Sequence, residues 1–201
     1  SGVSVRAGLW IAAMAMVTGL SGCAGGLIPT TPPDTYGLTA APAVSSGRAR
    51  NRQILISVPT ALKALDSEQI VIRTSPEAIE YLAKSQWSDR LPNIVQDKLV
   101  QAFENSGGVG GVGRPGDGLA IDYTIISAIR AFEIRADRGE LAVVELSVKV
   151  LNDRNGVVAA SKIFRSTSPV VGSGNAAYVQ SLDRAFEAVV QDLVSWTLSR
   201  I

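Results

Sequence analysis

The residues of this chain whose types could do chemistry are few, and the first to consider is Cys23. It is the only cysteine among 201 residues, and the chain contains no histidine. A lone cysteine can fill a core, act as a nucleophile, ligate a metal or carry a covalent attachment. Without histidine, the Ser-His-Asp and Cys-His catalytic arrangements cannot form, and zinc sites lose their main ligand. A lipid-anchored hydrolase would need Asp/Glu or Ser/Lys chemistry, and the sequence shows no paired constellation of that kind. We therefore expect no enzyme, no cofactor and no metal site.

The segment before Cys23 has the pattern of a secretory signal peptide, predicted here for residues 1–22. Arg6 is followed by fourteen uncharged, mostly apolar residues from Ala7 to Leu20. As a helix they would span about 21 Å, which is short of the ~30 Å hydrocarbon core of a membrane. A basic start, a short apolar stretch and small residues at its end are typical of a signal peptide. A buried core helix is the alternative.

The motif Leu20-Ser21-Gly22-Cys23 resembles the bacterial lipobox, in which cleavage precedes a cysteine whose sulfur carries a diacylglyceryl group. Two or more acyl chains anchor a protein stably, whereas one chain binds a membrane only marginally. Cys23 is therefore the predicted lipid attachment site, and residues 23–34 are the predicted flexible tether. In Gram-negative sorting an Asp after the cysteine favours inner-membrane retention, but Ala24 stands there. We expect a bacterial cell-envelope protein, anchored in the outer membrane and facing the periplasm.

Composition and charge indicate a neutral globular domain, expected as a single unit over residues 35–201. Hydrophobic residues make up 46% of the chain and charged residues 18%, which is typical of a folded protein. The 19 basic and 18 acidic residues leave a net charge of +1. A neutral domain without a basic block lacks the electrostatic footprint of a nucleic-acid-binding protein. We therefore exclude nucleic acid as a partner.

Hydrophobic periodicity predicts an α+β fold, a mainly antiparallel β-sheet with two amphipathic helices packed on one face. Alternating apolar residues from Leu141 to Leu151 indicate one buried strand face, and Asn155-Gly156 is a hairpin signal. The first helix, with Ser88 or Asp89 as its cap, is expected over 92–105. The second is expected over 175–199. The expected strands are 35–39, 54–59, 69–73, 78–82, two within 119–153 that join at a turn over 137–139, and 157–164.

Three further segments carry expectations of their own. The polar stretch 45–53 and the glycine-rich stretch 107–118 are predicted loops. The second contains G-x-G-x-x-G, but a helix precedes it and a strand follows, the reverse of the order in dinucleotide-binding folds. The apolar stripe of the last helix could pair with a partner helix or pack on the sheet, and we favour the sheet.

Trp87 and Arg90 are candidate partner contacts within Gln86-Trp87-Ser88-Asp89-Arg90-Leu91-Pro92 (QWSDRLP). Tryptophan and arginine are enriched at protein interfaces. The alternative for Trp87, which we favour, is a core anchor at the entry of the first helix.

The QWSDRLP segment follows a stretch of the form P..LK.LDSEQIVIR and precedes an amphipathic helix. In this order it resembles the ABC-type transport auxiliary lipoproteins of the PqiC-like group. Further matching features are Tyr36-Gly37-Leu38, the strand that ends in Ile129-Arg130-Ala131-Phe132-Glu133, and the terminal helix with Trp196. The likeness extends from about Tyr36 to Trp196. The sequence departs from the family pattern at 107–113 and 45–53.

The resemblance implies a non-enzymatic lipoprotein that works beside an ABC permease, its ATPase and a mammalian-cell-entry (MCE) domain protein. Such systems move lipids or other hydrophobic molecules between the two membranes. The family offers no catalytic residues that could be transferred to this sequence. A structural or assembly lipoprotein that partners an outer-membrane or cell-wall complex is the alternative function, and a homo-oligomer is left open.

Overall fold

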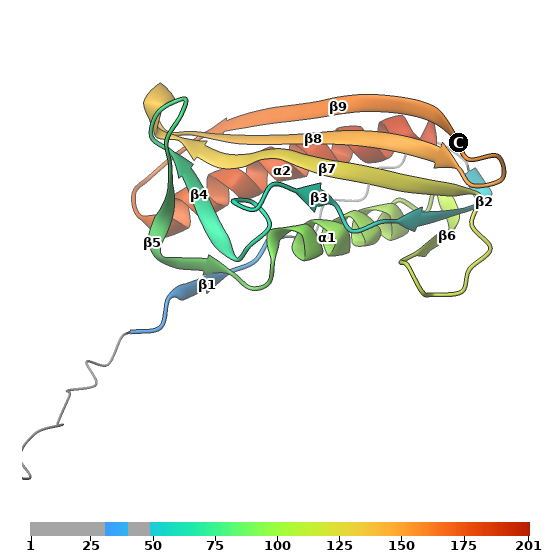
Figure 1. Cartoon of the computed structure of the whole chain (residues 1–201), viewed down its shortest axis with the longest axis horizontal. Coiled ribbons are helices and arrows are strands. Elements are labelled where there is room, and N and C mark those ends of the chain that lie inside the picture. Colours follow the sequence, from blue (N-terminus) through green and yellow to red (C-terminus); the bar gives the residue numbers. More distant parts are fainter. Residues whose placement is uncertain (1–30, 40–48) are drawn as a thin grey trace, which may run out of the picture. The chain divides into compact units, whose positions relative to one another are not determined.

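The computed structural model describes residues 31–39 and 49–201, and the fold lies in the unit Pro33–Ile201 (Figure 1). Within these residues two α-helices and a nine-stranded sheet form an α+β fold. The helices are α1 (Leu91–Ser106) and α2 (Asn175–Leu198), with a short 3-10 helix η1 (Ala136–Arg138). The strands are β1 (Asp34–Tyr36), β2 (Ala49–Ile56), β3 (Thr60–Ala61), β4 (Gln69–Arg73), β5 (Ile79–Trp87), β6 (Val109–Gly113), β7 (Tyr123–Arg135), β8 (Leu141–Asn152) and β9 (Val157–Pro169).

The long strand β7 organises the sheet. One side of β7 pairs antiparallel with β8 at twelve registered positions, and β8 pairs in the same way with β9. The other side of β7 receives three short strands in succession, β2, β3 and β4, all of them parallel to it. Beyond these, β4 pairs with β5, β5 with β1, and β2 with β6. The whole sheet is therefore built outward from β7.

The predicted α+β fold is confirmed, but the expectation of a mainly antiparallel sheet is wrong. The sheet is mixed, and among the described strands five pairings are parallel, those of β1 with β5, β2 with β6, and β7 with β2, β3 and β4. Three are antiparallel. The two predicted turns are present, with Gly139 and Gly156 at positive φ. Turn residues reveal antiparallel neighbours, whereas parallel strands join through long crossovers that leave no comparable local signal.

The glycine-rich stretch after α1 forms a strand where the sequence predicts a loop. Val109–Gly113 pairs in parallel with β2, because backbone hydrogen bonds require no side chain. Glycine also allows a close approach here, since a Cβ on Gly108 would lie 2.7 Å from Leu198 Cδ1. The predicted loop at 45–53 is corrected as well, because β2 begins at Ala49. The earlier part of that stretch lies outside the described residues.

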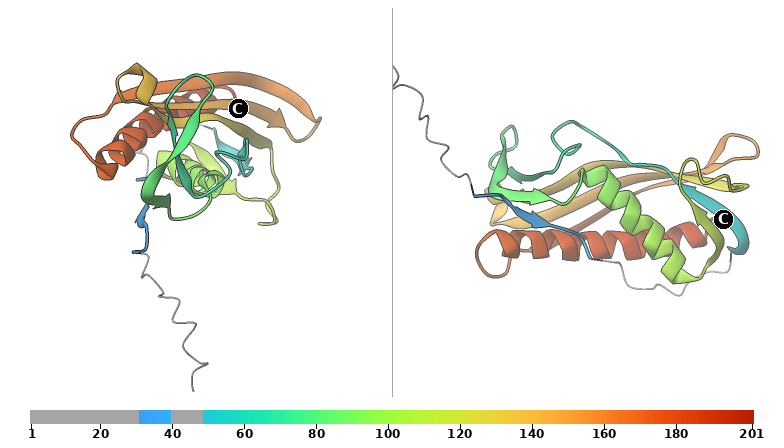
Figure 2. Two further views of the ribbon diagram at one scale, coloured as in Figure 1. Left: turned by 60° about the vertical axis from the view of Figure 1, so that its left-hand side comes forward. Right: turned by 90° about the horizontal axis from the view of Figure 1, so that it is seen from below.

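Both helices lie on the same side of the sheet, as predicted (Figure 2). Helix α2 packs on β8 and β9, and α1 contacts β2, β6 and α2. The alternating face of β8 is fully buried, and the apolar stripe of α2 lies in the same core, which confirms packing on the sheet. Near the end of α2, Trp196 packs edge-to-face on Phe164, with 5.4 Å between ring centroids. The buried residues of the β8 face are Ala142, Val144, Leu146, Val148 and Val150.

Helix α1 begins and ends close to the predicted residues, but without the predicted cap. Pro92 lies in its first turn, and Gly107 closes it in the left-handed conformation with φ +59°. Arg90 occupies the N-cap position, where the helix receives no side-chain hydrogen bond. The carboxylate of Asp89 instead accepts from the amide Nδ2 of Asn93, at 3.1 Å. The cap expected from Ser88 or Asp89 is therefore not formed.

Gln96 is a buried polar residue of α1 that supports the point where β2 leaves the sheet. Its Nε2 donates to the backbone carbonyl of Ile56, the last residue of β2, at 2.9 Å. A buried carbonyl that loses its donor costs about 1–3 kcal/mol. This hydrogen bond therefore fixes α1 against the sheet at one defined position.

We predict that Gln96→Leu lowers the free energy of unfolding by about 1–3 kcal/mol, because it leaves the Ile56 carbonyl buried without a donor. Urea unfolding followed by circular dichroism measures the change. Gln191→Leu is the matched control, since Gln191 bonds to Glu187 of its own helix, and it should change stability by no more than about 0.5 kcal/mol. Equal losses in the two variants would contradict the assigned role of Gln96.

Candidate functional site

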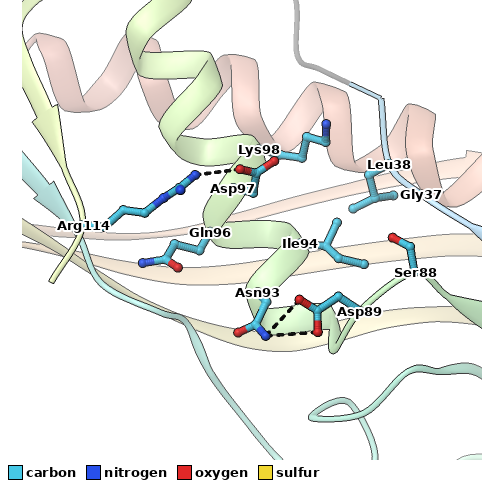
Figure 3. Close-up of a pocket in the computed structure, with 10 residues that line it drawn as sticks. All are labelled: Gly37, Leu38, Ser88, Asp89, Asn93, Ile94, Gln96, Asp97, Lys98 and Arg114. Atoms are coloured by element: carbon cyan, nitrogen blue, oxygen red, sulfur yellow. Dashed lines mark hydrogen bonds and ion pairs between the residues drawn. The ribbon is translucent and has the colours of Figure 1, made fainter. Parts of the chain in front are cut away.

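A groove along α1 is the candidate binding site of this chain, and we call it the α1 groove (Figure 3). Its volume is about 500 Å³, within the range of about 300–1,000 Å³ that is typical of ligand pockets. Residues from the segment after β1, from the β5–α1 junction, from α1 and from the loop after β6 line it. They are Gly37, Leu38, Ser88, Asp89, Asn93, Ile94, Gln96, Asp97, Lys98 and Arg114.

The junction between β5 and α1 forms one wall of the groove and coincides with QWSDRLP. Three backbone N–H groups of this junction donate to carbonyls of other segments. Trp87 N bonds to Glu68 O at 2.7 Å, Ser88 N to Tyr36 O at 2.8 Å, and Leu91 N to Ser67 O at 3.0 Å. The motif is therefore a junction of the fold, since it joins β1, β5, the loop before β4 and α1.

A bulge in β5 precedes this junction and determines its position. The register with β4 shifts along β5 and leaves extra residues between the two halves of the strand. Lys84 within the bulge has φ +56°, a left-handed conformation that is uncommon for a residue with a side chain. The bulge is held by Asn175, the first residue of α2, whose Nδ2 donates to Ala83 O at 3.0 Å and to Ser85 Oγ at 2.6 Å. The helix thus fixes the end of β5 that leads to the groove.

The segment after β1 lines the groove beside the junction, to which it is bonded through Tyr36 O and Ser88 N. Leu38 is buried in the hydrophobic core, although part of it lines the groove. The next residue, Thr39, donates through its backbone N and its Oγ1 to the carboxylate of Asp183 on α2, at 2.9 and 2.8 Å. In Figure 3 Gly37 and Leu38 lie on one side of α1 and Arg114 on the other. The groove therefore depends on contacts from both helices.

The charged groups of the α1 groove are balanced and largely engaged with one another. Arg114 donates to Asp97 at 2.6 Å from the loop after β6, and Gln101 donates to the second oxygen of Asp97 at 2.6 Å. On the adjacent turn, Asn93 holds Asp89. With Lys98 included, the lining contains two acidic and two basic side chains. Such an arrangement suits recognition of a polar, uncharged or zwitterionic segment better than proton transfer.

A second charged cluster lies where β2, β7 and the β8–β9 hairpin meet, and its centre is Asp122. The carboxylate accepts from the backbone N–H of Gln53 at 3.0 Å and from Arg154 at 2.7 Å. These two hydrogen bonds, in that order of importance, hold the pKa of Asp122 below its ordinary value. In return, Asp122 N donates to Gln53 O at 2.9 Å. We assign this cluster a structural role, because it joins strands that are distant in the sequence.

The two candidate partner contacts lie in different environments. The side chain of Trp87 is 1% exposed, and its ring packs edge-to-face on Phe132 with 5.7 Å between centroids. This supports the core-anchor alternative and corrects the expectation of Trp87 as a partner contact, because the ring has almost no surface to offer. Arg90 is exposed and forms an ion pair with Asp66. Arg90 therefore stays accessible beside the groove, while Trp87 supports the groove from within.

The remaining predicted site residues, Leu20-Ser21-Gly22-Cys23, lie outside the described residues, so lipid attachment at Cys23 stays a prediction. Among residues 31–39 and 49–201 there is no cluster of three or more His, Cys, Asp or Glu side chains suited to a metal ion. No helix of this part is long and apolar enough to cross a membrane. The sequence patterns did not single out Asp97, and they gave no sign of the pairing of Asp97 with Arg114. The two are 17 residues apart across the α1–β6 turn, and no local pattern links them.

We predict that Trp87→Ala lowers the free energy of unfolding by about 3–5 kcal/mol, because it leaves a cavity against Phe132. Trp87→Phe, which keeps an aromatic ring, should lose clearly less. Arg90→Ala serves as the surface control, and an exposed ion pair contributes at most about 1 kcal/mol. Thermal unfolding of the three variants measures the loss of stability in each, which should be largest for Trp87→Ala. A near-neutral Trp87→Ala would show that the ring does not anchor the core.

The chain is similar to known proteins over most of its described fold. The family model described as ABC-type transport auxiliary lipoprotein component matches residues 36–194. An uncharacterized protein of Bradyrhizobium diazoefficiens is 27% identical to the chain over 156 residues. That match covers 76% of this chain and 41% of the other, so the chain spans less than half the length of this relative.

Solved structures share the same architecture. A protein from Xanthomonas campestris is 27% identical, with a TM-score of 0.76 over 83% of this chain and 95% of its own. A hypothetical protein from Chlamydia trachomatis is 9% identical, with a TM-score of 0.54 over 75% and 97% of the two chains, and shows a likeness of fold alone. The family match covers well over half of the sequence and agrees with the resemblance carried by QWSDRLP. The chain therefore belongs to the family of ABC-type transport auxiliary lipoprotein components.

Proposed function

We propose that this chain is a non-enzymatic, lipid-anchored accessory protein of an ABC and MCE-type transporter. The transporter would move lipids or other hydrophobic molecules across the cell envelope. The observation that carries the proposal is the family match over residues 36–194, which spans almost the whole described unit. The family is an auxiliary transport component and not a known enzyme family. A lipoprotein of transport systems belongs to the cell envelope.

The α1 groove supports a role in binding. Its acidic groups are held by Asn93, Gln101 and Arg114, so recognition is the chemistry that the groove favours. Two contacts with α2 fix its position: Asn175 of α2 donates to Ser85 of β5, and Thr39, after β1, donates to Asp183 of α2. A groove held in this way presents a defined surface before a partner arrives, which lowers the entropic cost of binding.

The anchor follows from the sequence motif. The predicted lipobox Leu20-Ser21-Gly22-Cys23 precedes the fold in the sequence, and the predicted tether 23–34 ends at Asp34, the first residue of β1. Ala24 favours the outer membrane over the inner one in the sorting pattern set out above. The stretch Ala24–Asp34, if fully extended, reaches about 36 Å. The accessory domain could thus contact a transporter partner in the periplasm while its acyl chains stay in the membrane.

We predict that Cys23→Ala abolishes labelling with radioactive palmitate and leaves an uncleaved precursor. Without the thiol the diacylglyceryl group has no attachment point, and cleavage depends on that modification. The measurement is autoradiography of the immunoprecipitated protein beside its mobility on a gel. Ala24→Asp is the matched control, which should stay lipidated but move toward inner-membrane fractions on a sucrose gradient. A lipidated and processed Cys23→Ala protein would overturn the predicted anchor.

The transport role predicts a specific set of neighbours. Mild crosslinking in the intact envelope, followed by affinity purification of the full chain, should recover an MCE-domain protein together with its permease or ATPase. The Cys23→Ala protein should recover these partners at several-fold lower yield, because it lacks the anchor that brings it to them. Recovery of outer-membrane barrel or cell-wall proteins alone, at equal yield from both forms, would instead favour the structural or assembly lipoprotein.

A further inference from the structure

The outer margin of β9 is a long strand edge that the described fold leaves open. β9 pairs with β8 at twelve positions, and no described strand pairs with its other side. In Figure 1 it forms the border of the sheet, with no ribbon beyond it. β9 is 13 residues long. The strand path β1-β5-β4-β7-β2-β6 ends in much shorter strands, since β1 has 3 residues and β6 has 5. Such an edge presents unpaired N–H and C=O groups to any extended chain that approaches.

The side chains of β9 favour the approach of another strand. Val157, Val158 and Ile163 are exposed by 57%, 47% and 52%, and they are three of the ten large apolar side chains that are exposed in the described chain. Ala159, Ala160 and Ser161 between them are small. β-branched residues pack well on a pleated surface, and small ones let a second backbone come close. This edge strand therefore exposes apolar side chains against which the side chains of an added strand can pack.

Proteins usually protect such edges with bulges, prolines or charges. In β9 the bulge and the proline lie near the ends, and the two charged side chains, Lys162 and Arg165, lie between them. The register with β8 shifts near Ala159, and Pro169 closes the strand. Between them the pairing is regular from Ala160 to Ser168, with no proline. The ammonium of Lys162, within this stretch, lies over the Phe164 ring, 4.9 Å from its centroid. A central stretch of nine residues therefore stays available for pairing.

The charge of β9 indicates what kind of strand fits. The strand contains Lys162 and Arg165 and no acidic residue. Successive side chains of a strand point to opposite faces, so these two cations lie on different faces of the sheet. Arg165 donates to Glu145 of β8 at 2.9 Å, which neutralises it in part. Opposite charges directly across a strand pair stabilise the pairing. An incoming strand should therefore carry carboxylates on both of its faces, three residues apart or nearly so.

We propose that the β9 edge is a docking site for an extended, acidic segment of a partner protein, which adds a strand to the sheet. Main-chain hydrogen bonds along the edge would supply affinity, and Lys162, Ile163 and Arg165 would select the sequence. The proposal deepens the proposed function, on which it rests, because the partner segment is assigned to a component of the transport complex. The α1 groove remains free for a separate contact.

The test uses the full lipidated chain in its own envelope, with a photo-crosslinking amino acid in place of Ser161. Arg138, whose side chain is 71% exposed on η1, is the control position. We expect a crosslink from position 161 but not from position 138. Mass spectrometry of the product should map it to a segment of a transport component that contains Asp or Glu. Lys162→Gln combined with Arg165→Gln should reduce its yield roughly three- to tenfold. Lys162→Arg combined with Arg165→Lys should preserve the yield within about twofold, because both charges are kept.

Three results would overturn the proposal. They are a yield at position 161 no higher than at position 138, a crosslink to a second copy of this chain alone, and a yield that does not respond to loss of both charges. Circular dichroism of each variant verifies that the sheet is intact. The affinity purification described above separates the two ideas. If the transport components are still recovered while the crosslink at position 161 is absent, the result supports the proposed function and rejects β9 as a docking site.

Discussion

The rest of this fold depends on the unequal use of the two edges of β7. One edge is taken along its whole length by β8, and the other is divided among β2, β3 and β4. Because three short strands share one edge in succession, the segment 49–73 must run in the same direction as β7. The chain can reach β7 in that direction only after a crossover, which α1 supplies. The parallel pairing of β2, β3 and β4 with one edge of β7 thus explains both the mixed sheet and the position of α1.

A series of three packed aromatic rings in the core connects β7 to the wall of the α1 groove. Trp87 at the end of β5 packs on Phe132 of β7, and Phe132 packs on Phe186 of α2, with centroid distances of 5.7 and 5.6 Å. The same residue, Trp87, begins the junction whose backbone bonds form the groove wall. The groove is therefore positioned by the central strand and the long helix together. This explains why Trp87 is as buried as Phe132 and Phe186, each of them 1% exposed.

Local patterns in the sequence predicted the local parts of this structure. The periodicity of α2, the alternation in β8 and the turn at Asn155-Gly156 each depend on residues within one or two elements, and each is confirmed. Contacts between distant segments were not accessible in this way. The strand β6 was missed because glycine carries no side-chain pattern. The α1 groove was missed because Asp97, Arg114 and Leu38 meet only after the crossover is complete. The burial of Trp87 was favoured from the sequence, but its contact with Phe132, which is 45 residues away, was not predicted.

The strand order also separates the surfaces that could bind partners. β1 and β9 lie at opposite margins of the succession β1-β5-β4-β7-β8-β9. Five spacings of about 4.8 Å place them roughly 24 Å apart along the sheet. The predicted tether joins the fold at β1, and the α1 groove lies beside Gly37 and Leu38, just after that strand. A strand added at β9 would therefore bind at the margin farthest from β1, where the predicted tether joins the fold. The proposed anchor and the proposed docking edge thus use opposite margins of the sheet, so the two would not compete.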